Sequence, residues 1–447
     1  MNMILRTAAI ALAACVCASG AQIINEDFKL VASDAAGGDI FGGSVAVSRT
    51  TTIIGAFFDD DAGDFSGSAY LFDTKTGLEL FKLAASDSAE GDQFGTSVAI
   101  SRTTAIVGAF GDDDGGSAYL FDTETGLQIA KLTASDAEDG DLFGVSVAIS
   151  LNTAVVGASF SDDAGSNSGS AYLFDTETGH QLFKLTATDA QANDFFGHSV
   201  AISGTTAIVG APNSDDAGSN SGSVYLFDTL TGLQIAKLTS SEAASRDFFG
   251  HSVAISGSTA IVGLYVDHDA GSNSGSAFLF DTETFNELFK LTASVPSADD
   301  RFGSSVAISG TTAIVGSFGD DGAGSNSGSS YLFDTETGLH TAKLIATDAA
   351  ADDQFGGSVA IAGSTAIVGA SANDDAGPSS GSAYVFDTII EPCPADITGD
   401  GQLNFFDVSR FLTFFQIKDP IADFTNDGLF NFFDVSAFLQ AFAKGCP

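Results

Sequence analysis

Cationic residues are scarce in this chain of 447 residues, which has 16 lysines and arginines against 58 aspartates and glutamates. The formal net charge is −42, and this excludes nucleic acid as a natural partner, because binding to phosphates needs clustered cations. Proline is also sparse, with 7 residues against 51 glycines. Because 44% of the residues are hydrophobic, a disordered acidic chain is excluded. This composition predicts many short strands joined by tight turns.

Long apolar runs are missing beyond residue 21, where no segment approaches the roughly 18 residues that span a bilayer. The first 21 residues differ, with one cation in 1–6, an apolar stretch over 7–17 and small residues at 18–21. This order predicts a secretory signal peptide over residues 1–21. Residues 12–15 also resemble a bacterial lipobox, so lipid attachment at Cys15 stays open as an alternative.

Cysteine is rare as well, with 4 residues, of which only Cys393 and Cys446 lie outside the predicted signal peptide. They bracket the C-terminal segment, and an exported protein can oxidise such a pair. We therefore predict a disulfide between Cys393 and Cys446.

What the chain does contain is a repeat. The dipeptide Phe-Gly, followed by a Ser-Val-Ala strand, returns seven times at intervals of 49 to 53 residues. The phenylalanines are Phe41, Phe94, Phe143, Phe196, Phe249, Phe302 and Phe355. Self-similarity at such a period indicates a repeat architecture.

The repeat that begins at Phe196 contains four strand-like segments. Residues 199–203 alternate in polarity, 206–210 form a continuous apolar run, 223–228 alternate again and 233–239 follow a turn. Four strands without helical periodicity are typical of one blade of a β-propeller. A solenoid is the alternative, but it needs polar capping repeats that the sequence lacks. The predicted fold is an all-β seven-bladed propeller over residues 22–388.

The order of strands also predicts how the ring closes. A Lys-Leu strand occurs seven times, but its first copy precedes the first Phe-Gly and no copy follows the last apolar strand. The strand near residues 28–31 should therefore supply the fourth strand of the last blade. Such a closure removes exposed sheet edges.

These residues resemble the FG-GAP repeat family, known from the head of integrin α-subunits and from bacterial surface proteins. Phe196-Gly197 and Gly210-Ala211-Pro212 carry the resemblance most closely, and it covers roughly residues 23–388. The resemblance implies a seven-bladed propeller with an adhesive or ligand-binding role. In integrin-like blades a loop of the form Asp-x-Asp-x-Asp-Gly binds calcium, whereas residues 162–169 here read differently.

Antiparallel strands place two sets of acidic loops on one face of the predicted disc. The loops between second and third strands carry pairs such as Asp215-Asp216, and an aspartate stands two residues before each Phe-Gly phenylalanine. This second set comprises Asp39, Asp92, Asp141, Asp194, Asp247, Asp300 and Asp353. Two interpretations stay open: ordinary turn chemistry, which the composition favours, and calcium binding by oxygen-rich loops.

Catalytic constellations are weak, and we nominate no catalytic residue. His198 and His251 share one position after Phe-Gly, where the other five repeats have Gly, Thr, Val or Ser. We interpret the two histidines as surface variation. His180, His268 and His340 occupy different places in their repeats, so no shared zinc site is indicated.

After residue 388 the repeat stops, and two related twelve-residue loops follow, 27 residues apart. Side-chain oxygens at positions 1, 3 and 5, Gly at 6 and a carboxylate at 12 are the pattern of a calcium loop. The loops predict two Ca²⁺ ions. The ligands are Asp396, Thr398, Asp400, Gln402, Asn404 and Asp407 for the first ion, and Asp423, Thr425, Asp427, Leu429, Asn431 and Asp434 for the second. Gln402 and Leu429 would contribute backbone carbonyls.

Each loop is followed by an apolar helical pattern, over 408–415 and 435–442. Residues 389–447 thereby resemble a dockerin, the paired loop-helix module of the EF-hand kind that binds cohesin domains. The resemblance implies that positions 10 and 11 help to select the partner, and here these are Phe405, Phe406, Phe432 and Phe433. Packing of these rings into the small domain's own core is the open alternative. Thr398 and Thr425 depart from the usual Asn or Asp, which weakens the calcium cage.

Together these features predict an exported, non-catalytic adhesion or scaffold-associated protein at the cell surface or outside the cell. Its propeller presents a ligand face to a protein or glycan, and its tail docks to a cohesin-like or cell-surface partner. Two alternatives stay open. The chain could be a polysaccharide-binding or polysaccharide-degrading component of an extracellular complex, or a structural protein of a surface layer.

Overall fold

The computed structural model describes residues 22–112, 115–388, 395, 397, 405–425 and 429–444. Residues 23–388 form one compact unit, and the residues after 388 belong to a second. The predicted signal peptide, the Cys15 lipid site and the Cys393–Cys446 disulfide lie outside the described residues.

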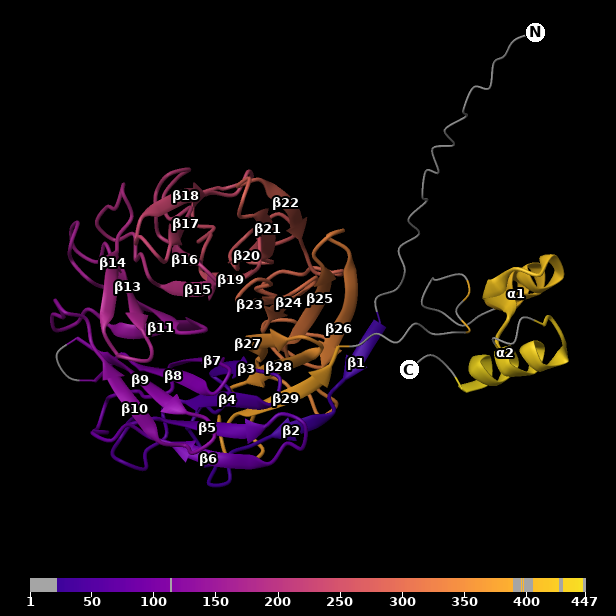
Figure 1. The fold of residues 1–447 in the computed structure, drawn as a ribbon, viewed down its shortest axis with the longest axis horizontal. Coiled ribbons are helices and arrows are strands. Elements are labelled where there is room, and N and C mark those ends of the chain that lie inside the picture. The colour runs from indigo at the N-terminus through magenta and orange to yellow at the C-terminus, as the bar shows by residue number, and fades with distance from the viewer. Residues whose placement is uncertain are drawn as a thin grey trace, which may run out of the picture. The chain divides into compact units, whose positions relative to one another are not determined.

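Seven antiparallel sheets stand around a common centre, as the sequence predicts (Figure 1). The innermost strands are β3 (Ser44–Val47), β7 (Ser97–Ser101), β11 (Phe143–Ser150), β15 (Ser199–Ser203), β19 (Ser252–Ser256), β23 (Val306–Ser309) and β27 (Phe355–Ala362). The second strands are β4 (Thr51–Ala56), β8 (Thr104–Ala109), β12 (Thr153–Ala158), β16 (Thr206–Ala211), β20 (Thr259–Leu264), β24 (Thr312–Ser317) and β28 (Thr365–Ala370). These second strands are almost fully buried because they are covered on both faces.

The outer half of each blade is equally regular. The third strands are β5 (Ser68–Asp73), β9 (Ser117–Asp122), β13 (Ser170–Asp175), β17 (Ser223–Asp228), β21 (Ser276–Asp281), β25 (Ser329–Asp334) and β29 (Ser382–Asp387). The fourth strands are β2 (Phe28–Leu30), β6 (Glu79–Leu83), β10 (Gln128–Leu132), β14 (Gln181–Leu185), β18 (Gln234–Leu238), β22 (Glu287–Leu291) and β26 (His340–Ile345). A further strand, β1 (Gln22–Asn25), adds a fifth member to the blade that ends in β26.

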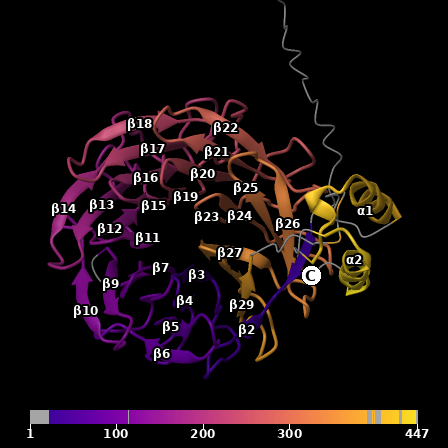
Figure 2. The ribbon, with the colours of Figure 1, turned by 45° about the vertical axis from the view of Figure 1, so that its right-hand side comes forward.

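The first repeat and the last meet in one sheet, which confirms the predicted ring closure. Strand β2 pairs with β29, with Phe28 opposite Val385 and Leu30 opposite Ala383. Figure 2 shows this junction, where the N-terminal strand β2 lies beside β29 from the last repeat. The blade that contains β27, β28 and β29 is therefore completed by the other end of the repeat array.

The phenylalanine of each Phe-Gly pair anchors the core between neighbouring blades. Phe196 is fully buried and meets Tyr225 and Phe227 of its own blade edge-on, with ring centroids 5.5 and 5.8 Å apart. The same cluster includes Leu173 and Leu185 from the preceding blade. Edge-to-face packing of this kind adds roughly 0.5–1.5 kcal/mol per pair to the burial of apolar area.

The described part of the C-terminal unit contains two short helices, α1 (Phe405–Ile417) and α2 (Phe432–Lys444), and a 3₁₀ turn, η1 (Pro420–Ala422). The sequence predicted helices over 408–415 and 435–442, and both in fact begin three residues earlier. Phe411 of α1 stacks on Phe438 of α2, with ring centroids 4.1 Å apart and planes 2° from parallel. Across the described residues, no helix has the length and apolarity needed to cross a membrane.

Candidate functional site

The acidic face of the propeller is organised around seven lysines, one from the fourth strand of each blade. Each lysine pairs with carboxylates of the loop that enters its blade, of the loop between the second and third strands, or of both. The seven are Lys29, Lys82, Lys131, Lys184, Lys237, Lys290 and Lys343. We call each such group a lysine cluster. In the sequence these lysines are visible as the repeated Lys-Leu strands, but nothing along the chain pairs them with the acidic loops.

The lysine cluster around Lys82 shows what the ammonium does. Asp34, Asp59 and Asp61 bring carboxylate oxygens within 4.8 Å of one another, close enough to hold a metal ion. The Lys82 Nζ lies among them, 2.7 Å from Asp34 and 3.0 Å from Asp59, and it also donates to Asp61. Burial alone would lower the pKa of Lys82, but hydrogen bonds to the three carboxylates outweigh it and raise that pKa. An internal cation thus lies where a metal ion would have to bind, and it balances one of the three carboxylate charges.

In every lysine cluster the lysine ammonium lies over an aromatic ring. Each ammonium lies 5.1–5.5 Å from the centre of a ring in the third strand of its blade, which is a tyrosine in six blades and Phe278 in the remaining one. A cation over an aromatic face is attracted by the ring quadrupole, by about 0.5–2 kcal/mol. The clusters are therefore structural units shared by all seven blades.

The aspartates two residues before each Phe-Gly phenylalanine are buried and cap their own loops. Asp194 accepts a hydrogen bond from the backbone N–H of Gln191 at 2.7 Å, and Asp300 accepts one from Ser297 at 2.6 Å. Burial raises the pKa of both, to about 6 for Asp300. These contacts are the turn chemistry that the sequence favoured for this face.

His198 and His251 are not independent surface positions, so that interpretation is wrong. Although they are 53 residues apart, their rings meet between adjacent blades, with 3.2 Å between His198 Nε2 and His251 Nδ1. The His251 ring also packs on Tyr265, with centroids 4.3 Å apart. Burial lowers the pKa of both histidines, to about 3 for His251, where the neighbouring His198 adds to the effect. Both rings are therefore neutral at physiological pH.

The second C-terminal loop brings its predicted ligands together. The Asp434 carboxylate is completely buried and accepts hydrogen bonds from Thr425 Oγ1 at 2.8 Å and from the Asn431 N–H at 2.8 Å. Thr425 Oγ1 also lies 3.5 Å from Asp423. The backbone hydrogen bond from Asn431 leads the contacts that lower the pKa of Asp434, so this carboxylate is ionised at neutral pH. The side chains at positions 1, 3 and 12 thus lie close together, whereas position 9 contributes its backbone N–H and its side-chain Oδ1 accepts from the Phe433 N–H.

The first loop is described only at its end. Asp407, its position 12, is completely buried in the first turn of α1, as Asp434 is in α2. The other predicted ligands of this loop, Asp396, Thr398, Asp400, Gln402 and Asn404, lie outside the described residues, as does Asp427 of the second loop. The two loops therefore agree at position 12, which is the one predicted ligand position described in both.

The four phenylalanines at positions 10 and 11 are exposed, and the alternative that they form the domain's core is wrong. Phe405 and Phe432 are each 76% exposed, and Phe406 and Phe433 are 69% and 68% exposed. The core is built instead around Phe411 and Phe438, with Phe424, Phe430 and Phe442 packed against them among others. Large aromatic side chains left in solvent in matching places on two helices define a surface available to a partner.

Fold and repeated side chains define a β-propeller of seven blades, followed by a small unit with two helices. The family model described as FG-GAP repeat matches seven segments of the chain, which are residues 24–72, 79–121, 127–174, 180–227, 233–280, 285–333 and 339–386. The chain belongs to the FG-GAP repeat family. Among curated proteins, none matches it.

Proposed function

We propose that this is an exported, non-catalytic binding protein. Its propeller binds a ligand outside the cell, and its C-terminal unit is a calcium-dependent docking module of the dockerin kind. The observation that carries the proposal is the contrast between the two units. In the propeller a lysine of each blade pairs with the acidic loops, whereas in the C-terminal unit the buried Asp434 has hydrogen-bond donors and, among the described residues, no lysine or arginine partner.

Calcium fits the chemistry of this second loop. Ca²⁺ takes six to eight oxygen ligands, and carboxylates, hydroxyls and carbonyls are the groups that converge here. Asp423, Thr425 and Asp434 would provide side-chain oxygens, and Leu429 a backbone carbonyl. The other ligands of the two loops are assigned from their positions in the twelve-residue sequence pattern. When bound, the two ions would hold together a domain whose core is small for its length.

Docking is supported by the exposed aromatic pairs at the starts of α1 and α2. Partner surfaces are enriched in aromatic anchors, and a few such residues carry most of the binding energy. Phe405 and Phe406 on one helix match Phe432 and Phe433 on the other. The partner would be a cohesin-like domain or another cell-surface protein.

Export follows from the predicted signal peptide over residues 1–21. Removal of this segment, or lipid attachment at Cys15, would place the chain outside the cell or on its surface. An oxidising environment would also let Cys393 and Cys446 close the C-terminal unit. A thiol assay on unreduced, exported protein tests this, and two free thiols would contradict it.

Calorimetric titration of the full chain with calcium tests the docking module. We expect two sites, with one lost in Asp407→Asn and the other in Asp434→Asn. Asp163→Asn, which removes a carboxylate of the acidic face that is already paired with Lys184, is the control and should leave both sites intact. Loss of sites in the control alone would place calcium on the propeller and overturn the assignment.

Partner capture is tested with the full chain in calcium and in chelator. Retention of a cohesin-like domain only in calcium, and its loss in Phe405→Ser combined with Phe432→Ser, is the expected result. Leu230→Ser, a substitution at a 72% exposed apolar residue of the propeller, is the matched control. Equal capture by the phenylalanine variant would show that the aromatic pairs are not the docking surface.

A further inference from the structure

Three cations without an ion pair lie on the propeller face opposite the lysine clusters. Arg49 and Arg102 lie in the turns β3–β4 and β7–β8, and Lys75 lies in the turn β5–β6. Antiparallel alternation places all three turns on one face, away from the acidic loops. Among the described residues, none of these side chains has a hydrogen bond or an ion pair. Three such cations in two adjacent blades form a local positive charge in a chain whose net charge is −42.

Both arginines depart from the repeat at the same position. The last four repeats have glycine there, at Gly204, Gly257, Gly310 and Gly363, with φ between 57° and 61°. Arg102 keeps this left-handed backbone at φ 57°, which glycine adopts freely and other residues adopt at a cost of roughly 1–2 kcal/mol. The third repeat has Leu151 at this position, with φ 55°, so the turn forms with glycine or leucine as well and does not itself require an arginine.

A cavity of about 610 Å³ lies between the two arginines. Besides Arg49 and Arg102, its lining includes the hydroxyl-bearing Ser48, Thr50 and Ser101, and it contains no acidic residue. We call it the arginine cavity. Two arginines therefore line one space that no carboxylate lines.

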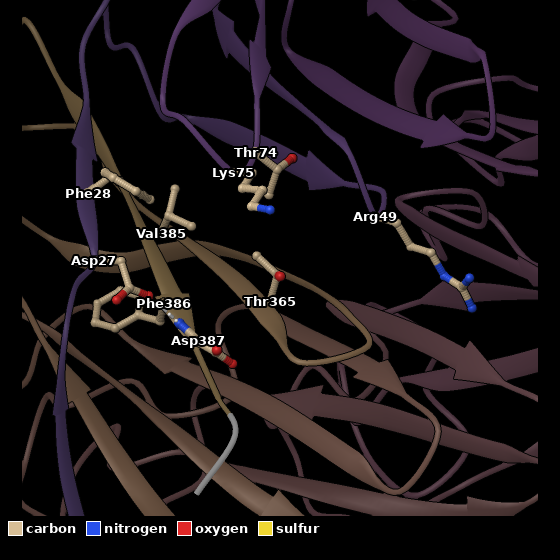
Figure 3. Close-up of a pocket in the computed structure, with 9 residues that line it drawn as sticks. All are labelled: Asp27, Phe28, Arg49, Thr74, Lys75, Thr365, Val385, Phe386 and Asp387. Carbon is tan, nitrogen blue, oxygen red and sulfur yellow. Dashed lines mark hydrogen bonds between the residues drawn. The ribbon is translucent and has the colours of Figure 1, made fainter. Parts of the chain in front are cut away.

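A second cavity of about 290 Å³ adjoins it and shares Arg49. Figure 3 shows Lys75 and Thr74 on one side of this second cavity, with Asp27 and Asp387 on the other. The Arg49 side chain points away from those two carboxylates. Its guanidinium is thus left available to the arginine cavity.

We propose that the arginine cavity binds an acidic saccharide, through a carboxylate or sulfate group held between Arg49 and Arg102. A guanidinium presents parallel N–H donors that match the two oxygens of such a group. The hydroxyls of Ser48, Thr50 and Ser101 suit the hydroxyls of a sugar ring, and Ile100 and Ala362 supply apolar surface beside them. The rest of the molecule is acidic and repels long polyanions such as nucleic acid. Binding of the acidic saccharide is therefore confined to the arginine cavity. The inference rests on the proposed ligand-binding role of the propeller and names its ligand class and site.

The test is calorimetry on the full chain with four probes: hexagalacturonate, a heparin-derived hexasaccharide, maltohexaose and hexaglutamate. We expect binding of at least one of the first two and none of the neutral maltohexaose; which of the two binds distinguishes a carboxylate from a sulfate ligand. Arg102→Gly restores the residue of the later repeats, so the turn is kept while affinity falls about tenfold or more. Arg49→Ala should have a similar effect.

Arg246→Gly is the matched control, because Arg246 also has a left-handed backbone, at φ 72°, but lies in a loop of the acidic face. It should leave affinity unchanged. Saccharide binding that is insensitive to Arg49→Ala and Arg102→Gly would overturn the arginine cavity as the site and leave the ligand-binding role standing. Binding of hexaglutamate alone would overturn the saccharide in favour of an acidic peptide. Silence with all four probes would overturn the inference, while the calcium titration of the C-terminal unit would still judge the docking function independently.

Discussion

At the scale of single residues, each blade depends on glycines that let neighbouring blades touch through their backbones. Gly197, the glycine of a Phe-Gly pair, has φ 90°, and a Cβ there would lie 2.2 Å from the carbonyl oxygen of Ser170 in the preceding blade. In return, a Cβ on Gly157 would lie 2.0 Å from the carbonyl oxygen of Gly197. The two glycines that recur in each repeat therefore form one contact across the blade interface.

Gly197→Ala should destabilise the propeller by about 2–4 kcal/mol, because it combines a left-handed backbone with a clash against a backbone atom that has no room to move. Chemical denaturation of the full chain measures the loss. Gly204→Ala is the control, since Gly204 also has a positive φ of 57° but nothing within 4 Å of the added Cβ. A smaller loss for Gly197→Ala than for Gly204→Ala would contradict the close-contact explanation.

The lysine clusters allow a second prediction at this scale. Lys82→Met removes the internal cation and leaves Asp34, Asp59 and Asp61 facing one another, so the variant should gain one calcium site relative to the wild type. Calorimetric titration counts the sites. Lys343→Met is the matched control, because the one ion pair described for Lys343 is with Asp320, and it should gain none. An unchanged stoichiometry in Lys82→Met would show that the three carboxylates alone are not a cation site.

At the scale of elements, the strand order was predictable and several side-chain partnerships were not. The period of Phe-Gly and the alternation within residues 199–203 identify the strands, because a strand with one covered face leaves that pattern in any sequence. The contact between His198 and His251, in contrast, corresponds to no pattern in the sequence. Equivalent positions in successive repeats become neighbours only when the ring of blades is built, so two histidines that look separate along the chain form one pair.

Whether Phe405 and Phe432 are exposed or enter the core stayed open in the sequence for a related reason. Both helices are rich in phenylalanine, and hydrophobicity alone does not say which rings enter a small core. The geometry of α1 against α2 decides it, because Phe411 and Phe438 stack on the inner sides while the rings at the helix starts remain in solvent. The loop spacing drew attention to Thr425 and Asp434, which are hydrogen-bonded in the structure, whereas the calcium ligands that it predicts stay a prediction.

The histidine pair predicts a pH dependence of stability. The folded-state pKa of each histidine lies below its unfolded value of 6.5. As the pH falls, the unfolded chain therefore binds protons at these histidines before the folded chain does. Stability is therefore lost as the pH falls below 6.5, and for His251 the loss ends near pH 3. Between pH 7.5 and 5 the wild type should lose at least about 2 kcal/mol more than the double variant His198→Ser, His251→Ser, whose serine already occurs at the equivalent position 304. Parallel unfolding curves at the two pH values measure it, and equal losses would mean that water reaches both rings.

At the scale of the whole molecule, the ring is closed by a strand of only three residues. Deletion of residues 22–31 removes β2 and with it the buried Leu30 and the lysine of the last lysine cluster, and it leaves β29 with an open edge. We expect Tm to fall by about 5 °C or more and the protein to self-associate through this edge. Thermal unfolding and size-exclusion chromatography report the two effects.

Deletion of residues 22–25 is the matched control, since it removes only β1, which is added outside a blade that already has four strands. This variant should stay monomeric with a much smaller change in Tm. Equal effects of the two deletions would mean that closure by β2 adds nothing to the stability of the ring.

The position of β2 also determines the order in which the blades can be completed during synthesis. Phe28 is synthesised more than three hundred residues before its partner Val385. The middle blades can fold as they emerge, but the last one must wait until both ends of the array are present. A chain whose translation stops before β29 has no partner for β2, so its ring of blades stays open.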